Sequence, residues 1–203
     1  MFVVFEGGEG AGKSTVAGMV AASLRDEGHG VLLTREPGGT AAGEQIRAVL
    51  RQPLTPWAET FAFLAARAQL VDEVIQPALA QGIIVLCDRF EASTFAYQGY
   101  ARGLDLRALE AANATATEGL HPALTAWLDI EPAAGLARKH GEEDAIATGR
   151  EELAFHERVR AGYRAQFTAA QPDTWIRVDA TLPPGEVAAS VLAAIRSRRS
   201  AVR

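Results

Sequence analysis

Residues 1–15 read MFVVFEGGEGAGKST, and this stretch decides the fold. The apolar run at 2–6 predicts a buried strand, and it leads into a segment of small residues: Gly7, Gly8, Gly10, Ala11 and Gly12. Glycine in such numbers weakens helices and strands alike, so the segment needs a purpose that outweighs the lost local stability. A backbone that must wrap closely around a ligand supplies such a purpose.

The same stretch matches the phosphate-loop pattern G-x-x-x-x-G-K-[ST] through Gly7, Gly12, Lys13 and Ser14. It lies between a predicted strand and a predicted helix at 13–27, which is the setting that the pattern requires. In such a loop, successive N–H groups surround the β-phosphate, Lys13 meets the β- and γ-phosphate oxygens, and Ser14 ligates Mg²⁺. The pattern therefore predicts a nucleotide phosphate site formed by Gly7, Gly8, Glu9, Gly10, Ala11, Gly12, Lys13, Ser14 and Thr15.

Beyond this stretch, short apolar runs alternate with longer amphipathic segments. The runs predict further strands at 31–35, 83–88, 124–130 and 175–179. Helical periodicity predicts helices at 13–27, 41–51, 57–80, 105–118, 132–139, 151–170 and 185–198. This alternation predicts an α/β fold with a five-stranded parallel sheet between helical layers. We expect residues 1–203 to form a single domain.

Composition excludes several kinds of partner. The chain has 20 basic and 25 acidic residues, and its one basic run, RSRRSAVR at the C-terminus, is short and contains no aromatic residue. This argues against nucleic-acid binding. No apolar stretch approaches the roughly 20 residues of a membrane helix, and the N-terminus has no charged leader, so we expect a cytoplasmic protein without membrane contacts. The single cysteine, Cys87, suits a reducing compartment and is expected to be buried.

Phosphate loops occur in switch GTPases, motor ATPases and kinases, so a second motif must separate these classes. The chain contains only two lysines, Lys13 and Lys139, and Lys139 lies in ARKHGEED. The guanine-recognition pattern N-K-x-D is therefore absent, which argues against a switch GTPase.

The second motif is CDRFEASTFAYQGYARG at 87–103, which follows the predicted strand at 83–88. Asp88 and Arg89 stand at the carboxyl end of that strand, where open parallel sheets bind ligands. Asp88 could hold Mg²⁺ through water, and Arg89 could grip a second phosphate. The alternative is an ion pair that only caps the strand.

The sequence resembles bacterial thymidylate kinases. The resemblance rests on FEGGEGAGKST, TREPGGT, FLAARAQ and DRFEASTFAYQG, and it continues in order through HPALTAWLDI and VDAT over nearly the whole chain. It implies a nucleoside monophosphate kinase fold with a lid, transfer of the γ-phosphoryl group of ATP to dTMP in dTTP synthesis, a requirement for Mg²⁺ at Ser14 and Asp88, and a homodimer.

The resemblance also implies an acceptor site. Phe63 and Arg67 are four residues apart, so a helix places them on one face, where the matching residues stack on thymine and bond its 4-oxo group. Tyr97 matches a ring that packs where a ribose 2′-hydroxyl would lie. The other expected substrate contacts are Glu9, Arg35, Glu36, Arg47, Arg89, Ser93, Thr94 and Gln98, with surface salt bridges left as the alternative for Arg35 and Arg47. Glu6, beside the loop, is expected to be structural.

The expected lid at about 138–152 departs from the family pattern. Some family members carry an arginine in the phosphate loop where this chain has Gly10, so the resemblance is to the type whose lid supplies the cations. The usual D-R-[IL] lid element reads Asp144, Ala145 and Ile146 here, without the arginine. The predicted catalytic cations are Lys13, Arg89, Arg138 and Arg150.

Two alternative functions remain open at this point. One is a related kinase that acts on another nucleotide or nucleoside, and the other is a nucleotide-binding module without catalysis. Turnover with ATP and a panel of deoxynucleoside monophosphates separates them.

Overall fold

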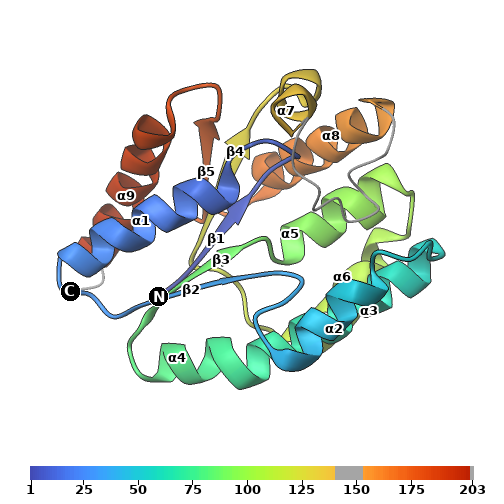
Figure 1. Ribbon diagram of the computed structural model, residues 1–203, viewed down its shortest axis with the longest axis horizontal. Coiled ribbons are helices and arrows are strands. Elements are labelled where there is room, and N and C mark those ends of the chain that lie inside the picture. Colours follow the sequence, from blue (N-terminus) through green and yellow to red (C-terminus); the bar gives the residue numbers. More distant parts are fainter. Residues whose placement is uncertain (140–152, 202–203) are drawn as a thin grey trace.

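The computed structural model describes residues 1–139 and 153–201. Within these ranges, one parallel sheet runs in the order β2-β3-β1-β4-β5 (Figure 1). The predicted parallel sheet is confirmed, and every strand lies within a residue of its expected ends: β1 (Phe2–Glu6), β2 (Val31–Arg35), β3 (Ile84–Asp88), β4 (Leu124–Asp129) and β5 (Trp175–Asp179).

Helices cover both faces of the sheet. On one face lie α1 (Lys13–Asp26) and α9 (Pro184–Ala201). On the other face lie the long helical segment that starts with α3 (Pro56–Leu70) and, beyond it, α8 (Leu153–Ala169). The remaining helices in the described ranges are α2 (Ala41–Val49), α5 (Glu91–Thr94), α6 (Leu106–Thr117) and α7 (Pro132–Lys139). No helix within 1–139 and 153–201 combines the length and the apolarity needed to cross a bilayer.

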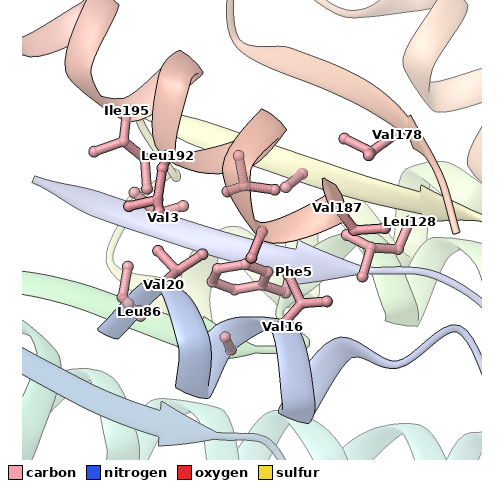
Figure 2. Packing of buried hydrophobic residues seen from close by; sticks show 14 of the residues in the cluster. Val3, Phe5, Val16, Val20, Leu86, Leu128, Val178, Val187, Leu192 and Ile195 are labelled. Carbon is pink, nitrogen blue, oxygen red and sulfur yellow. The ribbon is translucent and has the colours of Figure 1, made fainter. Parts of the chain in front are cut away.

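Strand alternation divides the core between the two faces. Val3 and Phe5 of β1 point toward α1 and α9, where they pack with Val20 and Ile195 (Figure 2). Phe2, on the other side of the same strand, belongs to the cluster under the α3 segment. Successive side chains of a strand point to opposite faces, so an uninterrupted apolar run is what a strand covered on both sides requires. Cys87 of β3 is buried and free, as expected.

Two helical regions differ from the expectation. The helix predicted at 57–80 is continuous from Pro56 to Ala80, but a π-helical turn, η1 (Val71–Ile75), separates α3 from α4 (Gln76–Ala80). The region 91–101, where no helix is predicted, forms α5 and a second π-helical segment, η2 (Phe95–Ala101). Ser93, Thr94 and Gln98 line the cavity, while Ala92, Ala96 and Ala101 are buried in a cluster with residues of α8. The apolar stripe of this segment therefore consists mainly of alanine and is weak.

The sheet topology places the functional motifs side by side. Phe5 pairs with Asp88, and Arg35 pairs with the same residue from the other side. The chain leaves β1 for β2, which lies beyond β3, and leaves β3 for β4, which lies beyond β1. The loops after these neighbouring strands therefore depart in opposite directions, and open α/β sheets bind ligands in the crevice formed there.

Candidate active site

A cavity of about 440 Å³ opens at the carboxyl ends of these strands. Of the predicted site residues in the described ranges, all but Gly7, Gly8 and Ala11 line this cavity. It is also lined by Pro37, which was not predicted, and by Lys139, which was expected in the lid but not among the site residues. The lining consists of Glu9, Gly10, Gly12, Lys13, Ser14, Thr15, Arg35, Glu36, Pro37, Arg47, Phe63, Arg67, Asp88, Arg89, Ser93, Thr94, Tyr97, Gln98, Arg138 and Lys139.

The phosphate loop uses glycine where its backbone turns tightly against neighbouring chain. Gly10 has φ +67°, and a Cβ there would strike the carbonyl of Gly135 in α7. The clash is reciprocal, because a Cβ on Gly135 would strike the carbonyl of Glu9. Glycine in these positions therefore allows the loop and α7 to lie in backbone contact.

Lys13 is the first residue of α1 and is buried. Its Nζ donates to the carbonyl oxygens of Gly8 at 2.8 Å and Gly7 at 3.1 Å. Burial, and then the charge of Arg89, lower the pKa of Lys13 to about 8. An anion against the ammonium group would offset both effects, so the loop is suited to a phosphate.

Ser14 and Asp88 provide the oxygen donors for the expected metal. The Ser14 hydroxyl donates directly to Asp88 Oδ2, which joins the start of α1 to the end of β3. A hydroxyl and a carboxylate in contact fit Mg²⁺, which takes hard oxygen ligands and is commonly bound through one carboxylate and substrate phosphates. No group of three or more His, Cys, Asp or Glu within the described ranges is arranged to hold a metal.

Arg89 lines the cavity and has a left-handed backbone conformation, with φ +71°. Its Nη2 donates to Glu9 Oε1 at 2.8 Å, and its Nη1 donates to the carbonyl of Gly7 at 3.2 Å and to Ser93 Oγ at 3.1 Å. The guanidinium also lies 5.1 Å from the ring centroid of Tyr97. These contacts hold a planar cation between the phosphate loop and η2, where it can meet an anion from either side.

Glu9 brings a negative charge into this cationic pocket. It pairs with Arg89 and also with Lys139, whose Nζ lies 2.7 Å from Oε2. Burial alone would raise the pKa of Glu9, but the charges of Arg89, Lys13 and Lys139 outweigh burial and hold it well below the usual range. Glu9 is therefore ionised, and it holds Arg89 and Lys139 on either side of its carboxylate beside the phosphate loop.

The two cations at the end of α7 point to different partners. Lys139 meets Glu9, whereas Arg138 Nη1 donates to the carbonyl of Ala180 at 2.8 Å, in the loop after β5. Both side chains line the cavity. The other predicted lid cation, Arg150, lies outside the described residues, as do Asp144, Ala145 and Ile146.

Arg67 is fully engaged by protein acceptors. It is 2% exposed, and its Nε and Nη2 both donate to Glu36, with Nη2 2.6 Å from Oε2. Nη1 donates to Thr94 Oγ1 at 3.0 Å and Asn113 Oδ1 at 2.7 Å, and Nη2 also reaches the carbonyl of Phe90 at 3.0 Å. Guanidinium has five N–H donors, so a base oxygen would have to share a donor already in use.

Two further arginines, Arg35 and Arg47, flank the cavity. Arg35 lies 3.4 Å from Glu44 in an exposed pair, and Arg47 Nη1 donates to the carbonyl of Pro37 at 3.1 Å. Arg35 therefore forms a surface salt bridge, which is the alternative that the sequence analysis left open for it. Both residues nevertheless line the cavity and add positive charge to its rim.

The sequence analysis did not identify Tyr163 or Asn113, which support the site through hydrogen bonds to Glu6 and Arg67. Glu6, expected to be structural, is buried and accepts hydrogen bonds from Phe90 N, Ser93 N, Ser93 Oγ and Tyr163 OH. Tyr163 OH also lies 3.4 Å from Arg89 Nη1. Glu6 and Tyr163 therefore anchor the segment that carries Arg89. The sequence signal was a charged residue inside an apolar strand, but nothing in it identified a partner 157 residues away.

Tyr163→Phe is expected to reduce the free energy of unfolding by about 1–3 kcal/mol, because the buried Glu6 carboxylate loses a donor without any change in packing. Denaturant unfolding measures the difference. Tyr100→Phe is the matched control, since Tyr100 is 39% exposed and its replacement should change stability by less than about 0.5 kcal/mol. Equal effects of the two substitutions would show that the Glu6 contact contributes nothing.

Comparisons with known proteins agree with the geometry. A family model described as thymidylate kinase matches residues 5–191. The chain is 50% identical to a thymidylate kinase of Thermomicrobium roseum and 47% identical to one of Trichlorobacter lovleyi, in each case over 98% of both chains. A crystal structure of thymidylate kinase from Ehrlichia chaffeensis is 31% identical and has a TM-score of 0.78, with 97% of this chain and 98% of that one covered.

Proposed function

The chain belongs to the thymidylate kinase family, and from that premise we infer that it is an enzyme that transfers the γ-phosphoryl group of ATP to dTMP. The observation that carries this inference is one cavity lined both by a phosphate loop and by an aromatic and cationic acceptor side. Phosphoryl transfer needs little covalent chemistry from a protein, because positioning and charge neutralisation supply most of the acceleration.

The ATP phosphates are proposed to lie along residues 7–15, with Lys13 against the β- and γ-phosphates. The amide groups at the start of α1 add their dipole to this interaction. Ser14 and Asp88 would hold Mg²⁺, which neutralises phosphate charge when bound. The contact between Ser14 and Asp88 supports this assignment, because both oxygens lie beside the loop.

The acceptor phosphate is proposed to lie near Arg89, with Arg35 and Arg47 at the rim of the cavity. Arg89 already touches the phosphate loop through Gly7, so it can neutralise charge on both sides of the transferred group. Lys139 and Arg138 would add charge from α7. Of these two, Lys139 is the better candidate for the transferred phosphoryl group, because its ammonium lies at Glu9 of the loop.

The base is proposed to stack on Phe63, with its edge toward Arg67, Thr94 and Gln98. Glu36 and Asn113 hold Arg67 in place. Because every Arg67 donor is in use, the thymine 4-oxo group would share Nη1 with Thr94 or displace its hydroxyl. Such a rigid cation favours a base of fixed shape.

The function is tested by turnover with ATP and a panel of deoxynucleoside monophosphates. We expect dTMP to have the highest kcat/KM, with production of dTDP and ADP in equal amounts. A preference for another acceptor would support the related-kinase alternative, and binding of ATP without any turnover would indicate a non-catalytic module. Removal of Mg²⁺ by a chelator should abolish turnover, because phosphate charge is then left without its metal.

Tyr97→Ala is expected to weaken the preference for dTMP over the corresponding ribonucleotide by about 10-fold or more, because it opens space beside the sugar. Tyr97 is 5% exposed, and its hydroxyl lies 3.4 Å from Glu9 Oε1. Tyr97→Phe keeps the ring and should keep the preference. The measurement is kcat/KM for both nucleotides in each variant, and an unchanged preference in Tyr97→Ala would exclude the ring from sugar selection.

A homodimer is proposed with α2 and α3 in its interface. These helices pack together and carry two apolar side chains in solvent, Val49 at 51% and Phe61 at 58% exposure. Phe61 also stacks on Trp57, with ring centroids 5.5 Å apart. Exposed apolar side chains on two helices in contact are typical of a protein interface.

Phe61→Glu is expected to shift the protein from dimer to monomer in analytical ultracentrifugation, since it places a charge in the buried interface. Leu182→Glu is the matched control: Leu182 is 41% exposed outside these helices, and its replacement should leave the dimer intact. A wild-type monomer at micromolar concentration would contradict the proposal.

A single-domain organisation and a cytoplasmic location complete the proposal. One sheet takes strands from Phe2 to Asp179, and the family match spans 5–191, both of which support one domain. The one cysteine is free and buried, as suits a reducing compartment.

A further inference from the structure

Glu59 of α3 lies behind the base side of the cavity and contacts it through Gln98. Gln98 Nε2 donates to Glu59 Oε2 at 3.3 Å. The two residues are 2% and 4% exposed, respectively. Gln98 lines the cavity, whereas Glu59 is not among the described residues that do so. Glu59 therefore acts on any ligand through the amide of Gln98.

The Glu59 carboxylate determines the orientation of the Gln98 side-chain amide. An ionised carboxylate only accepts hydrogen bonds, and only the nitrogen of an amide carries hydrogens, so Nε2 must face Glu59. Arg102 forms an ion pair with this carboxylate: its Nε lies 2.7 Å from Glu59 Oε2, and its Nη2 donates to Oε1 at 3.2 Å. Within the described ranges, Glu59 is the hydrogen-bond partner of the Gln98 side chain. The carbonyl Oε1 is thus the acceptor left for a ligand.

A hydrogen-bond acceptor in this position can recognise the hydrogen on N3 of a pyrimidine base. N3 of thymine and of uracil carries a hydrogen, whereas N3 of cytosine is an acceptor, and base edges are distinguished by such differences. We propose that Glu59 is a positioning residue that fixes Gln98 with Oε1 toward the base, so that the site selects pyrimidine monophosphates with an N3–H. This inference rests on the proposed function, which places a base beside Gln98.

The proposal predicts that the site prefers a base with N3–H over an analogue without it, and that this preference is lost when the Gln98 amide can adopt both orientations. A site built to bond an N–H rejects an analogue that lacks it, because the buried acceptor is then left unpaired. The informative analogue is the 3-deaza form of dTMP, a 4-hydroxy-2-pyridone of similar shape in which C–H replaces N3–H and the 4-oxo group becomes a hydroxyl that can still accept a hydrogen bond. Because the 4-position also changes, the comparison of wild type with the Glu59 variant isolates the contribution of N3–H. We expect wild-type kcat/KM to favour dTMP over this analogue by about 10-fold or more.

Glu59→Gln tests the role of the carboxylate. A glutamine at this position can donate or accept, so the Gln98 amide is free to adopt either orientation. We expect the preference for dTMP over the 3-deaza analogue to fall to within about 3-fold. The preference for dTMP over dUMP should stay as in wild type, because it reports on the 5-methyl group. A melting temperature confirms that the variant is folded.

Glu118→Gln is the matched control, since Glu118 accepts a hydrogen bond from Gln76 Nε2 at 3.2 Å on the surface. Both preferences should be unchanged in this variant. If Glu59→Gln does not fold, Glu59→Asp withdraws the carboxylate by one methylene and should lower the 3-deaza preference in the same way.

Three results would overturn the proposal: a wild-type 3-deaza preference near one, an unchanged preference in the Glu59 variant that folds, or equal loss of the 3-deaza and dUMP preferences. The last result would show general loosening of the pocket. Absence of dTMP turnover in the wild-type protein would instead contradict the proposed function, so the two failures are distinguishable.

Discussion

Lys13→Ala is expected to lower kcat by about 10²- to 10³-fold or more, because the charge that stabilises the β- and γ-phosphates during transfer is lost. Within residues 1–139 and 153–201, Lys13 Nζ donates to the carbonyls of Gly7 and Gly8, both in the phosphate loop, so its removal should leave the sheet and its covering helices in place. Steady-state kinetics with saturating dTMP measures the effect.

Two controls separate catalysis from folding in Lys13→Ala. Circular dichroism should show the helical content of the wild type, and calorimetry should show unchanged affinity for dTMP, because the acceptor contacts are proposed to lie elsewhere in the cavity. Activity within about 10-fold of wild type would contradict the role of Lys13 at the phosphates.

Arg89→Lys is expected to lower kcat/KM for dTMP by about 10²-fold, although the charge is conserved. Arginine presents a planar fork that reaches Gly7, Glu9 and Ser93 at once, and an ammonium group cannot reproduce these directions. The loss should appear in kcat/KM for dTMP much more than in the KM for ATP.

Arg196→Lys provides the matched control for Arg89→Lys. Arg196 pairs with Glu27 on the surface and has a side chain that is 55% exposed, so its replacement should leave the kinetics unchanged. If Arg89→Lys retained wild-type kcat/KM, a point charge would suffice and the fork geometry would have no role.

The sequence predicted the sheet and most of the cavity, because both depend on local patterns. The apolar runs define their own strands, and the glycines before Lys13 define the loop. Segment 91–101 shows the opposite case: polar residues line the cavity and the buried apolar residues are mostly alanines, so its weak periodicity did not identify it as helical.

The hydrogen bonds that hold the site residues in place could not be predicted from the sequence, because they join residues that are far apart in the chain. Asn113 bonds Arg67 from 46 positions away, and Tyr163 bonds Glu6 from 157 positions away. No periodicity links such pairs. Lys139 was expected in the lid, but its contact with Glu9 requires the orientation of α7.

The facing glycines at 10 and 135 restrict how this enzyme could evolve. A substitution from Gly10 to arginine, the residue that some family members carry in the loop, would meet the α7 backbone at its first side-chain carbon, before the guanidinium could help. Adaptation toward that design therefore requires α7 to move first or at the same time. The two catalytic designs are separated by a barrier that no single mutation at position 10 crosses, and directed evolution from this chain should seek activity gains in α7 before it seeks them in the loop.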